Sequence, residues 1–143
     1  MPADKIAANV IGIDLSGRFF VTTAVVASPA AAGETIIASL TVSANAALTS
    51  GVWLAGWAAY TVGTNGTAVQ LRLRQTNVAG TVVGNTGALT GSQHGAAILS
   101  ADDVNGFDAA AVLPGQTYVL TMQVTAGSAV STVSGVFLSA TVI

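Results

Sequence analysis

Alternation of apolar and polar residues with a period of two is the feature that most restricts how this chain of 143 residues can fold. It is clearest over Glu34–Val42, Thr67–Thr76 and Gln116–Thr125, where every second position is apolar. Successive side chains of a β-strand point to opposite faces, so the pattern predicts half-buried antiparallel strands. A further strand is predicted over Arg18–Ala27, and no segment has the apolar period of an ordinary helix.

Two other segments, Val52–Val62 and Gly135–Ile143, are apolar on both faces, and Trp53 and Trp57 share one face of the first. A strand that is apolar on both faces belongs to a sheet covered on both sides. In a small sandwich the second cover is most easily another subunit. These two segments therefore predict an interface between copies of the chain.

Turn signals separate the strands at the spacing of a β-sandwich. The pair Asn65-Gly66 predicts a two-residue hairpin of type I′, and Pro114-Gly115 predicts a type II turn. Further turns are predicted at Gly84–Gly87, Asn105-Gly106 and Gly127-Ser128.

The expected fold class is all-β, an antiparallel two-sheet jelly-roll sandwich of about eight strands over residues 18–143. An immunoglobulin-like sandwich stays open as an alternative. Residues 1–17 differ from the rest, because charged residues bracket the apolar run IAANVIGI. We expect this segment to be an N-terminal arm that orders against a neighbour, or a first strand.

Charged residues make up only 7% of the chain, against roughly 25% in ordinary globular domains, while hydrophobic residues reach 52%. The longest apolar run, Gly51–Gly63, is too short to cross a bilayer as a helix, and the N-terminal residues lack a signal-peptide layout. We therefore expect a soluble protein made in the cytoplasm, with apolar surface packed against other subunits. The net charge of −2 provides no basic stripe, so neither nucleic acid nor a membrane is an expected partner.

Residues that could carry catalysis are scarce, so we expect no enzyme activity, no cofactor and no metal site. The chain has no cysteine and one histidine, His94, which lies in a loop-like segment without a nearby carboxylate. One histidine without cysteines cannot form a His-rich metal site. Ser92 beside it does not by itself make a nucleophile and base pair.

The run DDVNGFD is the main acidic cluster and contains Asp102, Asp103, Asn105 and Asp108. Oxygen ligands at alternating positions around a glycine can hold a hard cation, which makes a weak calcium site one interpretation. The glutamate that ends a calcium-binding loop is missing, so a solvated turn before a strand is favoured.

Arg72 and Arg74 provide half of the four basic residues and project from the polar face of one predicted strand. Their guanidinium groups either lie in solvent or recognise carboxylates across an interface. Trp53 and Trp57 allow a sugar-stacking platform, but their segment is the most apolar one. Packing in the core or between subunits is therefore favoured for both.

Four motifs resemble those of a family of small virion proteins from tailed phages. The proteins of this family have a TNF-like jelly-roll fold. The four motifs are GWAAYTVGT at Gly56–Thr64, TAVQLRLR at Thr67–Arg74, PGQTY at Pro114–Tyr118 and GVFLSATVI at Gly135–Ile143. The resemblance covers roughly residues 33–143. It lies in the general pattern of residue types along the strands more than in invariant motifs.

The resemblance implies a homotrimeric capsid decoration or cement protein on the exterior of the phage head, where it binds the major capsid protein. The apolar strands then supply the trimer interface, through Trp53, Trp57, Tyr60, Phe137, Leu138 and Ile143. Contacts with the capsid are expected from the arm and from the two arginines, through Ile6, Val10, Ile11, Ile13, Arg72 and Arg74. The alternative is a receptor- or glycan-binding domain of a head fibre, tail fibre or baseplate.

Overall fold

The computed structural model describes residues 18–28, 33–42, 51–87, 97–109, 115–127 and 130–143. Within these ranges the chain forms no helix long and apolar enough to cross a membrane. The strands are β1 (Phe19–Thr22), β2 (Thr35–Thr41), β3 (Val52–Val62), β4 (Ala68–Gln75), β5 (Val82–Asn85), β6 (Ser100–Asp108), β7 (Thr117–Ala126) and β8 (Val130–Val142).

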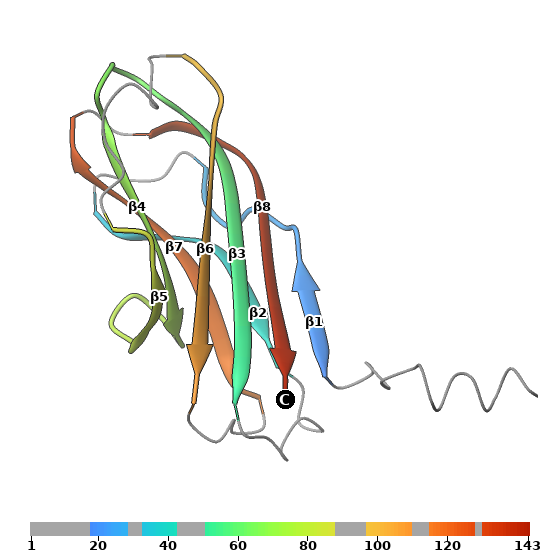
Figure 1. Ribbon diagram of the computed structural model, residues 1–143. Coiled ribbons are helices and arrows are strands. Elements are labelled where there is room, and N and C mark those ends of the chain that lie inside the picture. Colours follow the sequence, from blue (N-terminus) through green and yellow to red (C-terminus); the bar gives the residue numbers. More distant parts are fainter. Residues whose placement is uncertain (1–17, 29–32, 43–50, 88–96, 110–114, 128–129) are drawn as a thin grey trace, which may run out of the picture.

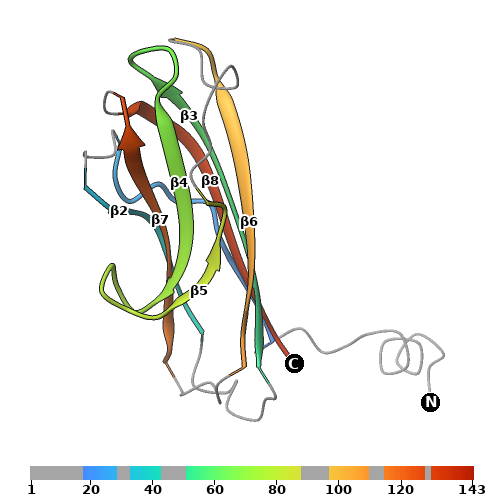
Figure 2. The same cartoon turned by 60° about the vertical axis from the view of Figure 1, so that its left-hand side comes forward.

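The strands form two layers, β1-β8-β3-β6 and β5-β4-β7-β2, which Figures 1 and 2 show packed against each other. β1 pairs with β8, β2 with β7, β3 with β6 and β4 with β5, each antiparallel. The first half of the chain is thus paired with the second half in reverse order. This nested order is that of a jelly roll, and it differs from that of an immunoglobulin-like sandwich. The predicted all-β jelly-roll class is confirmed.

Two seams join the layers, so the sheet is nearly closed. At the first seam β5 and β6 share one pair, Gly84 with Gly106. A Cβ atom on Gly106 would lie 2.3 Å from the carbonyl oxygen of Val83, so the two strands meet this closely because both positions lack side chains. At the second seam the Val26 amide donates to the Ile37 carbonyl over 2.8 Å.

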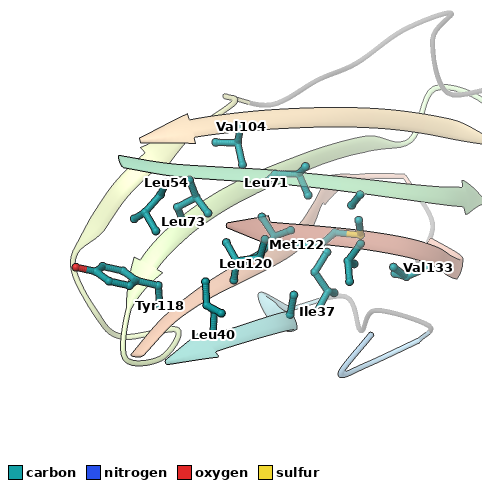
Figure 3. Packing of buried hydrophobic residues seen from close by; sticks show 14 of the residues in the cluster. Ile37, Leu40, Leu54, Leu71, Leu73, Val104, Tyr118, Leu120, Met122 and Val133 are labelled. Carbon is teal, nitrogen blue, oxygen red and sulfur yellow. The ribbon is translucent and has the colours of Figure 1, made fainter. Parts of the chain in front are cut away.

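An aliphatic core lies between the two layers (Figure 3). Leu54 of β3, Leu71 and Leu73 of β4, and Leu120 and Met122 of β7 are at most 2% exposed. The four core residues of β4 and β7 lie on the apolar face that the period-two pattern predicts. Full burial of one such side chain stabilises the fold by about 1.5–3 kcal/mol.

A β-bulge shifts the alternation in β2. The sequence pattern places Ile36 on the buried face, but the pairing of β2 with β7 slips between Ile36 and Ala38. Ile37 is fully buried as a result, whereas Ile36 is partly exposed. An extra residue in one strand of a pair produces this change, and the sequence carries no mark of it.

The connection at Asn65-Gly66 is not the predicted two-residue hairpin. β3 and β4 lie in different layers and do not pair, so the five residues Gly63–Thr67 cross from one layer to the other. Gly66 has a φ of 73°, but Asn65 does not have the positive φ that a type I′ turn requires. Gly115, with a φ of 78°, fits the third position of the predicted type II turn.

Candidate interaction surfaces

The outer face of the layer β1-β8-β3-β6 carries most of the aromatic side chains of the chain. The sequence has two Trp, two Tyr and four Phe, eight in total. Five of these eight are between 37% and 54% exposed on this face, which we call the aromatic face: Phe19, Trp53, Trp57, Phe107 and Phe137. The two tyrosines are fully buried instead. Exposed aromatic residues gathered on one face are typical of surfaces that bind a partner.

Strand register sets these aromatic side chains in two rows. Trp53 of β3 lies opposite Phe107 of β6, with ring centroids 4.7 Å apart and planes tilted by 42°. Four residues further along β3, Trp57 lies opposite Phe137 of β8. Residues directly opposite in an antiparallel pair project to the same face, so each pair forms a continuous apolar ridge. Ala55 lies on β3 between the two rows.

The aromatic face has the size of an interaction site. A fully exposed aromatic side chain offers about 150–250 Å², so five at about two-fifths exposure offer about 400 Å². Val21 and Ile143 add exposed aliphatic surface beside them. The largest apolar patch on ordinary monomers is roughly 300–600 Å², and patches of this size often mark binding sites. Such a patch would fill the apolar centre of a standard interface of about 800 Å² per partner.

The six residues predicted for the trimer interface divide between surface and core. Trp53, Trp57, Phe137 and Ile143 are exposed, and their role in an interface stays a prediction. Tyr60 and Leu138 are 0% exposed and lie in the core of the single chain, so they offer no surface to a partner. The reason is the pleat, because alternate residues of β3 and β8 point inward.

Sequence reasoning missed three exposed residues of this surface: Phe19, Val21 and Phe107. Phe19 and Val21 alternate with inward-facing residues of β1, and that pattern could have located them. Phe107 lies in the acidic run that was interpreted as a turn. Only the pairing of β6 with β3 brings it beside Trp53.

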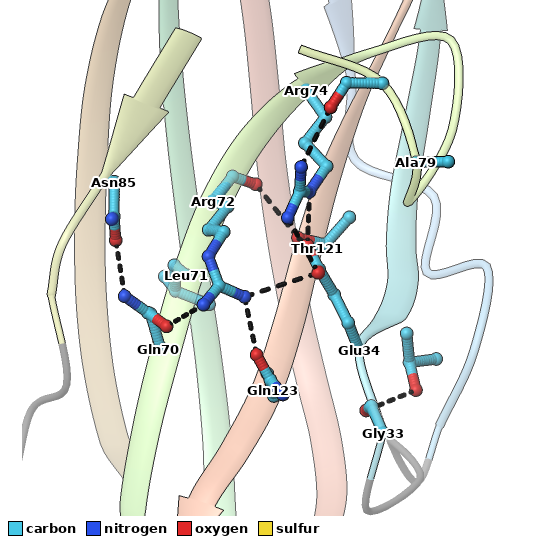
Figure 4. Close-up of polar contacts among 12 residues, drawn as sticks. Gly33, Glu34, Gln70, Leu71, Arg72, Arg74, Ala79, Asn85, Thr121 and Gln123 are labelled. Atoms are coloured by element: carbon cyan, nitrogen blue, oxygen red, sulfur yellow. Dashed lines mark hydrogen bonds and ion pairs between the residues drawn. The ribbon is translucent and has the colours of Figure 1, made fainter. Parts of the chain in front are cut away.

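The outer face of the other layer holds a polar cluster centred on Glu34 (Figure 4). Arg74 donates from Nε to Glu34 Oε1 over 2.6 Å and from Nη2 to Oε2 over 2.9 Å. Thr121 of β7 donates to the same Oε1 over 2.6 Å, and Arg72 Nη1 lies 3.3 Å from Oε2. One carboxylate therefore links the start of β2 to β4 across β7.

Both arginines of this cluster are occupied within the chain. Arg72 also donates to Gln123 Oε1 over 2.6 Å and to Gln70, and Arg74 Nη1 donates to the carbonyl oxygen of Gly80 over 2.8 Å. Neither guanidinium group lies on a solvated strand face, since both side chains are about one-sixth exposed. A contact between these arginines and a capsid stays a prediction.

The charge state of Glu34 follows from these contacts. Burial favours the neutral acid, but the hydrogen bonds from Arg74 and Thr121 and the charges of Arg74 and Arg72 outweigh it. Together they hold the pKa of Glu34 below its ordinary value of 4.5. The ionised carboxylate is therefore part of the folded structure at neutral pH.

The acidic run is not the predicted solvated turn, because Asp102, Asp103, Asn105 and Asp108 all lie within strand β6. Asp102 accepts a hydrogen bond from the Tyr60 hydroxyl, while Asp103 is exposed. Asp102 and Asp108 are six residues apart, about 20 Å in an extended strand, so their carboxylates do not converge on one ion. The described residues contain no group of three potential metal ligands.

Asp108 accepts a hydrogen bond from the other buried tyrosine, Tyr118. The Tyr118 hydroxyl donates to Asp108 Oδ2 over 2.8 Å, and Gln75 Nε2 donates to the same oxygen over 2.6 Å. Burial, the hydrogen bond to Asp108 and the charge of Asp108 all raise the pKa of Tyr118. These contacts satisfy buried polar groups and do not resemble an acid–base pair that is open to a substrate.

Several predicted sites lie outside the described residues. They are Ser92 and His94 in their loop-like segment and the arm residues Ile6, Val10, Ile11 and Ile13. The arm assignment for residues 1–17 stays a prediction.

No protein-family model and no curated protein matches this sequence. Among solved structures, a chain of infectious bursal disease virus, Gx strain, matches with a TM-score of 0.55 and 14% identity over 87% of this chain. A chain of the VP2 subviral particle of infectious bursal disease virus matches with a TM-score of 0.54 and 15% identity, again over 87%. This chain spans 32% and 33% of those two chains. At such identities the likeness establishes a shared fold.

Proposed function

We propose that this chain is a structural virion protein, a homotrimeric decoration or cement protein on the exterior of a phage head that binds the major capsid protein and stabilises the shell. The aromatic face carries this proposal. It exposes Trp53, Trp57 and Phe137 on a continuous sheet surface, which is the composition of a contact between subunits. No enzyme activity, cofactor or nucleic acid is part of the proposal.

The distribution of charge supports an assembly role. Glu34 forms ion pairs with both Arg72 and Arg74 within the chain, and Asp102 and Asp108 accept hydrogen bonds from tyrosine hydroxyls. A surface with few uncompensated charges can be covered without a large desolvation cost. Because a capsid repeats the same contact many times at high local concentration, a modest interface is sufficient there.

The fold agrees with this class of function without identifying it. The two chains of infectious bursal disease virus named above share the fold at low identity. A jelly roll alone does not define a function, since unrelated proteins use it. The proposal therefore rests on the aromatic face together with the resemblance of the strand motifs to phage virion proteins.

Native mass spectrometry and a binding assay with empty expanded capsids test the proposal. We expect a trimer that binds capsids, and a monomer that ignores them would contradict both parts. The double variant Trp53→Ser, Trp57→Ser should dissociate the trimer. Val82→Ser is the matched control, because Val82 is similarly exposed but lies on β5 in the other layer, and this variant should stay trimeric.

A truncation separates the arm from the domain. Removal of residues 1–15 should weaken capsid binding more than it weakens the trimer, since the arm is proposed to reach a neighbour or the shell by strand addition. Normal decoration by the truncated protein would show that the arm is not a capsid contact.

Glycan binding is the second candidate, and the exposure of Trp53 and Trp57 favours it. Asn105 and the carboxylate of Asp103 lie on β6 beside these rings and could bind sugar hydroxyls. A glycan array with the wild-type protein and Trp57→Ala tests this candidate. Binding that the substitution abolishes would support it, whereas no binding together with a stable trimer would exclude it.

A further inference from the structure

β1 and β2 are the two ends of the strand order, so each has one edge that no other strand of the described residues covers. In Figure 1 β1 lies beside β8, and no strand lies on its other side. The seam that joins the two layers at this end is made by Val26 and Ile37, beyond the last residue of β1. The four residues Phe19–Thr22 therefore keep a free edge.

The register of β1 on β8 decides which backbone groups point to this edge. The Val142 amide of β8 donates to the Arg18 carbonyl over 2.7 Å. Hydrogen-bonded pairs alternate with non-bonded pairs in an antiparallel ladder, so the bonds to β8 recur at the even-numbered residues of β1. The amides and carbonyls of Phe19 and Val21 point away from β8, and no hydrogen bond within the described part of the chain engages them.

The β2 edge is protected against pairing with another chain, whereas the β1 edge is not. β2 contains a bulge, and its outward residues beyond the bulge, Ser39 and Thr41, are polar and exposed. Proteins use bulges, charged residues and prolines to prevent an edge strand from pairing with another chain. β1 has the sequence FFVT, which contains none of these devices, and Phe19 and Val21 are exposed on it. An edge of this kind can accept a further strand.

The segment directly before β1 has the composition of such a strand. Within the N-terminal arm, the eight-residue run Ile6–Ile13 has neither charge nor proline, and Ile and Val occur at both its odd-numbered and its even-numbered positions. A strand added to β1 needs apolar residues on both faces. One face would lie beside Phe19 and Val21, and the other beside Phe20, which packs against the core.

The position of the arm indicates which β1 edge it covers. The arm is continuous with β1, so two copies that meet along this edge place the arm of each beside the β1 strand of the other. The same edge borders the aromatic face, because Phe19 and Val21 belong to both. The proposed function assigns that face to contacts between copies.

We propose that the run Ile6–Ile13 of one copy adds as a strand to the β1 edge of a second copy, through the amides and carbonyls of Phe19 and Val21. The proposal rests on the decoration function, in which the arm reaches a neighbour or the shell, and it assigns the arm to the neighbour. Each exchanged arm links two copies by backbone hydrogen bonds that need no charged residue.

Hydrogen exchange of the full-length protein at high concentration tests the proposal. The amides of Phe19 and Val21 should exchange at least about tenfold more slowly than unprotected amides of the same intrinsic rate. Ser39 and Thr41 are the matched control within the same chain, because they lie on the other edge and should exchange freely. Free exchange at Phe19 and Val21 would overturn the proposal.

Two variants identify the source of the added strand. Val21→Pro removes a donor from the free edge without breaking a bond to β8. Val10→Pro with Ile11→Pro breaks the arm in any register, because successive amides of a strand point to opposite edges. The arm variant should lose protection at Phe19. An excess of unlabelled Val21→Pro protein should restore that protection in isotope-labelled arm variant, since it retains the arm that the variant lacks.

The other outcomes contradict the exchange of arms. Protection that persists in the arm variant would show that something else covers β1. A loss of protection that the mixture does not restore would show that the edge is covered by the arm of the same chain. Capsid binding by the wild-type protein is measured separately, so a failure of the decoration function can be distinguished from a failure of the arm exchange.

Discussion

Replacement of Glu34 by glutamine removes the carboxylate that holds the polar cluster together. The variant keeps the size of the side chain but leaves Arg72 and Arg74 without a counter-charge. The three side chains are 15–17% exposed, so water screens them only in part. Removal of one partner from a fully buried ion pair costs about 3–5 kcal/mol, and the residual exposure lowers this to about 2–4 kcal/mol for Glu34→Gln.

The pH dependence of this loss has a defined sign. The pKa of Glu34 is below 4.5 in the folded chain and near 4.5 in the unfolded chain. The contribution of the carboxylate to stability is therefore complete above pH 4.5 and is lost as the pH falls through the lower folded-state value. The difference between wild type and Glu34→Gln should shrink over that acidic range.

Urea unfolding at pH 7 and at a series of acidic pH values, at constant protein concentration, measures both effects. Asp103→Asn is the matched control, because it removes the same charge from an exposed position and should change stability by about 0.5 kcal/mol or less. A Glu34→Gln loss below about 1 kcal/mol at pH 7, or one that does not change with pH, would refute the role assigned to the carboxylate.

Three further predictions concern other parts of the fold. Tyr118→Phe removes a donor from the buried Asp108 carboxylate and should cost about 1–3 kcal/mol in urea unfolding, whereas Thr41→Val at an exposed hydroxyl contact should be nearly neutral. Equal losses would contradict the buried role. Gly106→Ala should cost about 1–3 kcal/mol because its Cβ meets a backbone carbonyl, while Gly33→Ala has open space and should not destabilise. Calcium or a chelator should leave the melting temperature unchanged, and a shift would restore the cation-site interpretation of the acidic run.

Alternation predicts those strands whose two faces meet different environments. The alternating segments Glu34–Val42 and Thr67–Thr76 contain β2 and β4. One face of each of these strands packs in the core and the other face does not. Apolar and polar residues therefore alternate along the sequence with a period of two. The number of strands and the sandwich class follow from the spacing of such segments.

Features that depend on contacts between distant residues could not be predicted. Glu34 binds Arg74 from 40 positions away, and no local pattern selects this partner. Asn65-Gly66 has the composition of a hairpin, yet the winding of the jelly roll sends the two strands into different layers. The acidic run forms a strand because β3 pairs with all seven of its residues, which overrides its weak strand propensity.

The largest apolar side chains of this chain, those of the two tryptophans, do not lie where its high apolar content would suggest, because they are on the outer face and not in the core. The apolar segment around Trp53 and Trp57 predicted packing either in the core or between subunits. The core is filled by Leu, Ile, Val and Met together with two tyrosines whose hydroxyls donate to Asp102 and Asp108. Tyrosine can be buried here because each inward-facing aspartate satisfies its hydroxyl. Trp53 and Trp57 are left for the outer face. The same acidic strand that supplies the aspartates to the core also places Phe107 beside Trp53, so β6 serves the core with one face and the aromatic face with the other.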